Sequence, residues 1–455
     1  MFMEKTVEAA VIGAGLTGLT TAFYLKKKNR DFIVLEEKEI PGGVIRTRTE
    51  NGFVYEEGPN TGIIGNPDVA ELFEDLGDLC KCEIAGEKVK KRYILKDGAW
   101  VTMPMGGWQA VNTPLFTLRD KFRLLGEPFR KRGTNPDEAL SELVKRRMGQ
   151  SFLDYAIDPF ILGVYAGDPS LLITRYAFPK LYNLEQNYGS FIGGSIKKQF
   201  GKKDEREKKA NRKVFSVYGG LSAIVNALWK SAGEEHFIFN IKDLEINPEG
   251  DFFIIKGMQN NEAVTVKSRK VITTSGSYTL RKLLPFADNE LLLEIEKLKY
   301  ARVIQVVLGF NKWNGMLLDG FGGLVPFMEK RDILGVLFIS ALLSHRSPEG
   351  GALFSVFVGG VRRDDLSDRT DDEIRKIVRR EFSDVMKVQD FNPDLFKIIR
   401  YKYAIPQYGS ESQRKIEALE KLESKYKGLT IGGNLRNGIG MADRIKQGKY
   451  LADIF

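Results

Sequence analysis

The 455-residue sequence has few of the residues that build disulfide frameworks, metal centres or hydrolytic triads. It contains two cysteines, Cys80 and Cys82, and two histidines, His236 and His345. Two cysteines are too few for a disulfide framework or an iron–sulfur cluster. Two histidines leave little from which to build a zinc site or a Ser/His/Asp triad. We therefore expect no metal site, no redox role for the cysteines, and two solvated histidines.

Long apolar runs are also missing. No stretch of about 18 uninterrupted apolar residues occurs, so we expect no membrane span. The first residues lead almost at once into a predicted strand, which leaves no room for a signal peptide. Together with the cysteine usage, this predicts a cytoplasmic protein. The hydrophobic content of 43% and charged content of 28% are those of a globular protein, large enough for two or three structural units.

The net charge of +9 is concentrated in one segment. Residues 197–213 hold nine Lys or Arg against three acids. A solvated loop or exposed helix explains such a run, and so does attraction to an anionic lipid surface. Nucleic acid is the weaker alternative, because Phe200 is the single interleaved aromatic and no recognised motif accompanies the run.

What the sequence does have is a glycine motif between two predicted strands. The segment VEAAVIGAGLTGLTTAFYLKKKNRDFIVLE reads as strand, glycine turn, helix, strand and acid. The first glycine permits a tight turn, the second lets backbone approach a pyrophosphate, and the third lets the helix lie on the strand. The acid is placed to accept the hydroxyls of an adenosine ribose. The predicted dinucleotide residues are Gly13, Gly15, Gly18 and Glu36.

The stretch after the acid favours FAD over NAD. An NAD domain would continue with another helix and strand, whereas EKEIPGGVIRTRTENGFVYEEGPNTG offers a second glycine turn, an arginine and a third turn along an extended cofactor. The acid itself disfavours the 2′-phosphate of NADP. The candidate cofactor residues here are Gly42, Gly43, Arg46, Gly58, Pro59, Asn60 and Thr61.

The far end of the chain repeats the pattern of strand, glycine turn and helix. LTIGGNLRNGIGMADRIKQG predicts a helix from about Met441 with Asp443 in its first turn. The positive end of that helix would stabilise the negative charge of a reduced isoalloxazine. We therefore predict FAD held by both ends of the chain, with Gly433, Asn434, Gly440 and Met441 as further cofactor residues. The flavin N5 carries the chemistry, so no catalytic side chain is predicted.

The rest of the chain alternates between strand-rich and helix-rich stretches. Helical periodicity dominates residues 106–213, whereas strand patterns recur after Val214. We predict an α/β fold with α+β excursions, containing a discontinuous Rossmann-like FAD-binding domain, a β-rich substrate domain and a helical domain. The predicted boundaries are 1–60, 214–276 and 425–455 for the FAD-binding domain, 61–97 and 277–424 for the substrate-binding domain, and 98–213 for the helical domain.

Ordered motifs outside the glycine turns resemble a known family. With the fingerprint and the closing GGN…GIGMADRIKQG, the chain resembles the oxygen-dependent protoporphyrinogen oxidase family of the amine-oxidase-like flavoproteins over essentially its whole length. The motifs that carry the resemblance are GVYAGDP at 163–169, FP at 178–179, EQNYGS at 185–190, FGGLVP at 321–326, ILGVLF at 333–338 and IPQY at 405–408.

The resemblance implies a reaction and a site. Protoporphyrinogen IX would be oxidised to protoporphyrin IX in haem biosynthesis, with O2 reoxidising FAD and giving H2O2. Arg92 matches an arginine that anchors a propionate, Gly163 a glycine whose carbonyl faces a pyrrole N–H, and Leu324 and Phe338 the pocket walls. The alternative for Arg92 is a solvated side chain without a ligand. The alternative for Leu324 and Phe338 is that they belong to the ordinary core of the sheet.

The resemblance also implies a cellular location and interaction partners. The helical domain would face an anionic membrane, as a peripheral protein on the inner face of the cell membrane. The resemblance further implies a homodimer and transfer of the product to a ferrochelatase. It implies no nucleic-acid partner.

Two departures and several alternatives stay open. The adenine-side strand places Asp243 where the family usually has valine, and Met441-Ala442-Asp443-Arg444 differs from many relatives. Coproporphyrinogen III is an alternative substrate, which more pocket cations would favour, and Lys90, Lys91 and Arg92 keep it open. An amine oxidase, a carotenoid desaturase and a non-catalytic flavin-binding scaffold are the remaining readings.

Overall fold

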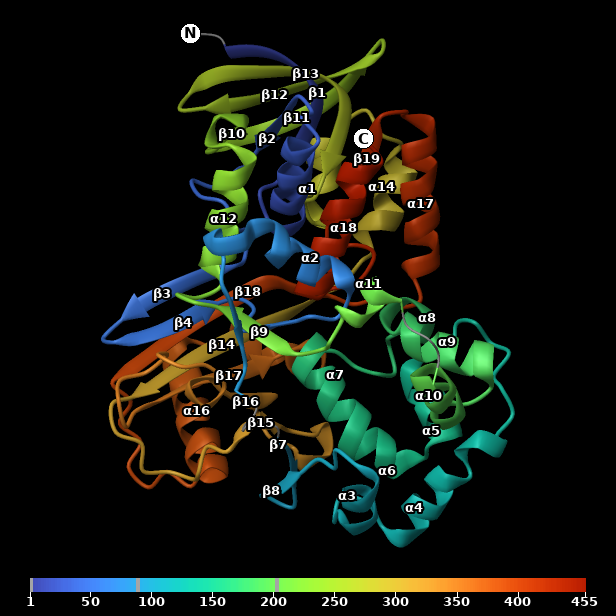
Figure 1. The fold of residues 1–455 in the computed structure, drawn as a ribbon, viewed down its shortest axis with the longest axis vertical. Coiled ribbons are helices and arrows are strands. Elements are labelled where there is room, and N and C mark those ends of the chain that lie inside the picture. The colour runs from blue at the N-terminus through green and yellow to red at the C-terminus, as the bar shows by residue number, and fades with distance from the viewer. Residues whose placement is uncertain (1–2, 87–90, 201–203) are drawn as a thin grey trace.

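The computed structural model describes residues 3–86, 91–200 and 204–455. It contains two large sheets and a group of helices, as Figure 1 shows. The first sheet lies at the top of the view with both chain ends beside it. The second sheet lies at the lower left and the helices at the lower right. The predicted mixed α/β fold is confirmed.

The first sheet has a parallel centre and an antiparallel edge. The central strands pair in parallel, and two further strands extend β13 as an antiparallel meander. Helices cover both faces of the centre, so Ala9, Ala10 and Val11 are all fully buried. The strand order is β10 (Phe237–Ile238), β2 (Phe32–Leu35), β1 (Met3–Ile12), β13 (Glu262–Thr273), β12 (Phe252–Gln259) and β11 (Ile241–Glu249), with β19 (Leu429–Ile431) also pairing with β13.

The helices on the two faces come from distant parts of the chain. One core contains α1 (Leu16–Lys27), α2 (Pro67–Leu76), α12 (Ser222–Ala232) and α18 (Met441–Asp453). The core on the opposite face contains α13 (Leu280–Leu283), α14 (Asn289–Glu296) and α17 (Ser412–Lys425). These last three were predicted within the substrate domain, but their apolar side chains pack against the first sheet instead.

The second sheet is mainly antiparallel, and α16 (Asp371–Met386) covers one of its faces with Ile374, Val378 and Phe382. Its order is β18 (Leu395–Pro406), β14 (Tyr300–Phe310), β17 (Ala352–Gly359), β16 (Gly335–Phe338), β15 (Gly320–Leu324), β7 (Lys91–Lys96) and β8 (Ala99–Thr102). The predicted boundary at residue 97 is wrong in this detail, because β8 follows it and pairs with β7.

Smaller elements connect these regions. A hairpin joins β3 (Arg46–Glu50) to β4 (Phe53–Glu57), and a three-stranded sheet joins β5 (Gly62–Ile63), β9 (Val214–Val217) and β6 (Cys82–Ile84). Short helical turns are η1 (Gly77–Leu79), η4 (Glu234–His236), η5 (Ser277–Thr279), η6 (Phe327–Glu329), α15 (Ile339–Leu342) and η7 (Val361–Asp368).

The helical region follows β8 and ends before β9. Within the described ranges, no helix is long and apolar enough to cross a bilayer. The elements are α3 (Gly107–Asn112), α4 (Leu118–Leu125), η2 (Glu127–Phe129), α5 (Leu140–Arg147), α6 (Gln150–Phe152), η3 (Leu153–Ile157), α7 (Asp158–Tyr165), α8 (Thr174–Ala177), α9 (Pro179–Tyr188), α10 (Phe191–Phe200) and α11 (Glu205–Lys208).

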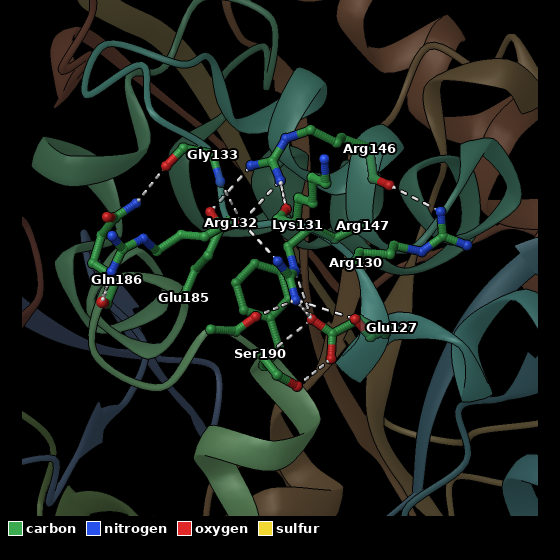
Figure 2. Close-up of polar contacts among 12 residues, drawn as sticks. Glu127, Arg130, Lys131, Arg132, Gly133, Arg146, Arg147, Glu185, Gln186 and Ser190 are labelled. Carbon is green, nitrogen blue, oxygen red and sulfur yellow. Dashed lines mark hydrogen bonds and ion pairs between the residues drawn. The ribbon is translucent and has the colours of Figure 1, made fainter.

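A buried ion cluster joins these helices, as Figure 2 shows. Arg147 of α5 is fully buried between Glu127 of η2 and Glu185 of α9. Glu127 also accepts hydrogen bonds from the Ser190 hydroxyl at 2.6 Å and from the Phe191 N–H at 2.9 Å. Although burial opposes it, these bonds hold the pKa of Glu127 below its usual range. Removing one partner would leave a buried charge uncompensated, so the cluster fixes the packing of the region.

The structure corrects one sequence expectation and adds detail to another. His236 is not solvated: its ring stacks on buried Phe32 with 4.4 Å between ring centres, whereas His345 is exposed as expected. The basic run is not a free cationic patch along its whole described length. Arg206 and Lys209 form ion pairs with acids of α2, namely Asp68, Glu71 and Glu74.

Candidate functional site

The first glycine turn leaves open space where backbone would approach a ligand. A Cβ on Gly18 would lie 1.9 Å from the carbonyl oxygen of Gly13, so only glycine lets α1 lie on this turn. Gly13 has a φ of 100°, which favours glycine. A Cβ on Gly15 would meet no atom within 4 Å. The side of Gly15 toward which a side chain would project is therefore free of protein, and the space there can receive a ligand.

Glu36 ends β2 directly beside this turn. Its carboxylate accepts hydrogen bonds from the Ala14 N–H at 2.6 Å and the Lys38 N–H at 2.9 Å. These bonds fix the orientation of a carboxylate that is only 8% exposed. Each oxygen keeps acceptor capacity for a hydroxyl group.

The second glycine turn packs against the first. The Gly42 N–H donates to the Ala14 carbonyl at 2.8 Å. A Cβ on Gly43 would lie 3.3 Å from the Cα of Gly15. Arg46 begins β3 just beyond this turn and forms no ion pair with any described residue, so its guanidinium is available to an anion.

The third turn, residues 58–61, joins the glycine turns to the second sheet. The Gly58 N–H donates to Oε1 of Gln305 at 3.3 Å, and the Ser355 hydroxyl donates to the side-chain oxygen of Asn60 at 2.9 Å. Pro59 and Thr61 are half-buried in the same turn. An elongated ligand in the glycine turns would therefore extend toward one face of the second sheet.

The C-terminal glycine loop points its carbonyl groups in one direction. Arg444 donates to the carbonyl oxygens of residues 436, 437 and 438 at 2.9 to 3.1 Å. The hydroxyl of Tyr408 lies 2.7 Å from the carbonyl oxygen of Asn434. The N–H groups of residues 434–439 have no acceptor among the described residues, although Leu435 is fully buried. A run of N–H groups without acceptors suits an anion, and the unpaired N–H of buried Leu435 is itself a rare feature, so this loop fits an anionic or hydrogen-bonding ligand.

The helix after this loop adds a further positive end. α18 starts at Met441, directly after Gly440, and Asp443 accepts a hydrogen bond from the Gly440 N–H at 3.1 Å. The predicted helix start is confirmed. The first N–H groups of α18 have no intrahelical acceptor, and together with the helix dipole they favour negative charge.

One face of the second sheet is covered by α16, and the opposite face is not. Side chains alternate along strands, and paired residues share a face. Leu337, Gln305 and Phe357 lie on the same face as Leu324, because they are linked through the β14–β17–β16–β15 pairings. Leu324, Leu337 and Phe357 are only half-buried, which leaves apolar surface for a ligand.

Gly163 and Leu324 lie in direct contact at this face. A Cβ on Gly163 of α7 would lie 2.4 Å from Cδ2 of Leu324, so a larger residue would displace either the helix or the leucine. Arg92 occupies the same face of β7 as Ile94, which pairs with Leu324. Arg92 is exposed, with its guanidinium carbon 5.4 Å from the centre of the Phe321 ring, and forms no ion pair with a described carboxylate.

Phe338 does not lie at this face. It is fully buried and packs on Phe354 and Tyr93 in the core beneath α16. The prediction of Phe338 as a pocket wall is therefore wrong, and the plain β-core alternative is right. Its neighbour Leu337 points to the opposite face and is half-buried, so period-two alternation outward from Leu324 could have identified it.

Asp243 does not direct its side chain at the glycine turns. It lies in a β-bulge of β11 with a φ of 52°, and its exposed carboxylate pairs with Lys282. The residue of β11 next to Glu36 is Ile241, whose N–H donates to the Glu36 carbonyl at 3.1 Å.

Comparison with known families identifies the fold and the cofactor class. The model of the flavin-containing amine oxidoreductases matches residues 16–453. The chain belongs to this family. Its cofactor is FAD, and the geometry agrees: open space above Gly15, an oriented Glu36 carboxylate, an unpaired Arg46 and unbonded N–H groups in the closing loop.

Individual relatives of this flavoprotein cover nearly its whole length. Protoporphyrinogen oxidase 2, chloroplastic/mitochondrial, of Arabidopsis thaliana is 29% identical over 98% of this chain and 93% of its own. Coproporphyrinogen III oxidase of Bacillus subtilis is 26% identical, over 96% of each chain. A crystal structure of a protein from Exiguobacterium sp. 255-15 superposes with a TM-score of 0.81 at 21% identity, covering 99% of this chain and 98% of that one.

Several residues at the flavoprotein's site were missed by the sequence reasoning. Gln305 and Ser355 anchor the 58–61 turn, and Tyr408 and Arg444 hold the closing loop. The position of Arg444 in the first turns of a helix that follows a glycine loop is a readable signal. Nothing local marks Gln305 or Ser355, because their partners are far away in the sequence.

Proposed function

We propose that this flavoprotein oxidises protoporphyrinogen IX to protoporphyrin IX in haem biosynthesis, using O2 and releasing H2O2. The observation that carries the proposal is the half-buried apolar face around Leu324, closed by Gly163 and with Arg92 on the same face. A porphyrinogen is an apolar macrocycle with carboxylates on one edge, so an apolar face with a cation is complementary to it. The names of two relatives agree with this class of substrate.

Within this proposal, the side chains of the protein bind the porphyrinogen and orient it. When bound, FAD would supply the hydride acceptor at N5. Leu324 and Leu337 offer an apolar surface for the macrocycle. Gly163 lets α7 lie close to this surface, which limits the thickness of a ligand that can bind between them. Arg92 would hold a propionate as a bidentate donor, which sets the macrocycle's orientation.

The charge near Arg92 favours protoporphyrinogen over coproporphyrinogen III. Coproporphyrinogen has more carboxylates, so its site calls for more unpaired cations. Lys91 is already ion-paired with Asp319, and Lys96 donates to the carbonyl oxygens of Pro114 and Leu115. Within the described part of β7, this leaves Arg92 as the cation with neither an ion pair nor a side-chain hydrogen bond. Lys90 lies outside the described residues.

The experiment is an aerobic assay of the purified flavoprotein with each porphyrinogen, following porphyrin fluorescence and H2O2 together. We expect porphyrin and H2O2 from both substrates, with a higher kcat/KM for protoporphyrinogen. A higher kcat/KM for coproporphyrinogen would show that coproporphyrinogen III, and not protoporphyrinogen IX, is the preferred substrate. Flavin-loaded protein that forms no porphyrin from either would be a binding scaffold instead.

We also propose a peripheral contact with an anionic membrane through α3, α4 and η2. Trp108, Phe122 and Phe129 are 81%, 72% and 91% exposed there. Arg119, Lys121 and Arg123 alternate with the apolar positions of α4. Exposed aromatics beside basic residues are typical of helices that lie in a membrane interface.

A further inference from the structure

Two buried cations lie behind the C-terminal glycine loop. Arg444 of α18 is 8% exposed and Lys415 of α17 is 1% exposed. Neither forms an ion pair with any residue that the structure describes. The Lys415 ammonium lies 4.6 Å from the centre of the Tyr408 ring, and the hydroxyl of that ring reaches the loop. Both cations are therefore connected to the loop directly or through one aromatic ring.

The neighbouring acids accept hydrogen bonds from other groups. Asp443, the acid nearest Arg444 along α18, accepts from the Gly440 N–H. Glu411, the acid whose charge acts on Lys415, accepts from the Gly409 N–H at 3.1 Å. Burial lowers the pKa of Lys415 from its ordinary value of 10.5 to about 8, and it also lowers the pKa of Arg444. Both pKa values stay lowered although the charges of Glu411 and Asp443 oppose the shift, so protein groups compensate these two cations only in part.

An unpaired buried cation is costly, so proteins keep one where an anion balances it. The natural anion here is the cofactor. The carbonyl oxygens of residues 434 and 436–438 accept from Tyr408 and Arg444. Because the peptide unit is planar and trans, the N–H groups of residues 435 and 437–439 point away from these two side chains. The cations, the free N–H groups and the start of α18 all favour negative charge on the other side of the loop.

We infer that Lys415 and Arg444 form an electropositive support behind the loop, which stabilises the negative charge of reduced FAD and thereby raises its reduction potential. Arg444 also positions the loop through its three carbonyl contacts. Lys415 acts through charge and through Tyr408. The inference rests on FAD as the cofactor and not on the identity of the substrate, so failure of the porphyrinogen assay leaves it intact.

The first test compares Lys415→Met with Lys415→Arg and with the control Lys421→Met, which removes an exposed lysine from the same helix. The readouts are the two-electron midpoint potential of the FAD-loaded protein and its affinity for sulfite. Sulfite donates its electron pair to oxidised flavin and leaves a negative charge on the pyrimidine side, so its affinity reports nearby positive charge.

For Lys415→Met we expect about tenfold weaker sulfite binding and a potential about 30 mV lower, the two-electron equivalent of that factor. Lys415→Arg and Lys421→Met should keep both wild-type values. Methionine fills a similar volume without burying a charge, so this variant should fold. A Lys415→Met protein with bound FAD and wild-type potential and sulfite affinity would overturn the inference.

The second test separates charge from positioning with Arg444→Lys. Lysine keeps the charge but loses the planar fork that reaches three carbonyl groups. We expect FAD to dissociate at least tenfold more readily, while the potential of the bound fraction stays close to wild type. Unchanged FAD affinity would remove the positioning role, and a potential that falls as in Lys415→Met would contradict the assignment of charge to Arg444.

Discussion

Gly43 lies directly against Gly15, since a Cβ on Gly43 would approach the Cα of Gly15 to 3.3 Å. The two glycine turns are therefore one surface, although 27 intervening residues form a helix, a strand and a loop. The space above Gly15 is open, and Arg46 follows the second turn. One cofactor can use both turns at once.

Gly15→Val should abolish FAD binding without unfolding the protein. Gly15 has a φ of −72°, which valine adopts, and a Cβ there meets no protein atom, so the folded apoprotein should lose no more than about 1 kcal/mol. The added side chain fills the space meant for the ligand. Flavin absorbance after purification, alongside thermal unfolding, measures both effects.

The matched control is Gly106→Val, because Gly106 also has open space around its Cβ position and a negative φ but lies at the start of α3. It should retain full flavin content. A Gly15→Val protein that remains yellow with wild-type affinity would show that this turn does not face the cofactor.

Arg92→Ala should raise KM more than it lowers kcat. Arg92 is exposed and has no ion pair with a described residue, so its removal should cost little stability, and it would contribute mainly to holding a substrate carboxylate. Steady-state kinetics with protoporphyrinogen would show a KM about tenfold higher. Lys91→Ala is the control because Lys91 is paired with Asp319, and its KM should change little. An unchanged KM in Arg92→Ala counts against the anchor.

Lys415 should make stability depend on pH in the alkaline range. Its folded-state pKa of about 8 lies below the ordinary 10.5, so the unfolded chain binds more protons between these values. The free energy of unfolding therefore rises with pH across this window, by on the order of 2 kcal/mol for this group alone. Below about pH 8 the full cost of the buried charge is present.

Denaturant unfolding of wild type and Lys415→Met between pH 7 and about 10 isolates this contribution, because the other titrating groups cancel in the difference. The variant should be more stable at pH 7 and lose its advantage as the pH rises. A difference that does not vary with pH would show that Lys415 has the same pKa in the folded and unfolded chain, so that its charge is solvated or compensated in the folded protein.

The proposed membrane contact predicts that Phe122→Ser with Phe129→Ser weakens binding to anionic vesicles at least tenfold. Both rings are exposed, so stability should be nearly unchanged, while each buried aromatic contributes about 2 kcal/mol to insertion. Cosedimentation measures the loss. Leu79→Ser with Leu317→Ser, two exposed leucines outside the helical region, is the control. Equal sedimentation of the two double variants would exclude α4 and η2 as the contact.

Local signals predicted the cofactor half of the site well. Strand, turn and helix around Gly13 lie within one segment, and the start of α18 follows from Asp443 in its first turn. These features depend on neighbours in the sequence. The requirement for glycine at position 18 is equally local, because a Cβ there would lie 1.9 Å from the carbonyl oxygen of Gly13.

Features that depend on long-range pairing could not be predicted in the same way. Phe338 was misplaced because a shift of one residue moves a side chain to the opposite face of a sheet, and an apolar run does not reveal which face is which. The acids that neutralise Arg206 lie on α2, about 135 residues earlier in the chain. The packing of α17 on the first sheet depends on partners just as remote.

Porphyrinogen oxidation by the flavin is tested most directly by an anaerobic titration of the purified, FAD-loaded protein with protoporphyrinogen, recorded by absorption spectroscopy. We predict that the yellow flavin bleaches as the porphyrin spectrum appears, and that admitting air restores the colour with formation of H2O2. Bound flavin that stays yellow in the presence of excess porphyrinogen, yet bleaches with a chemical reductant, would contradict it.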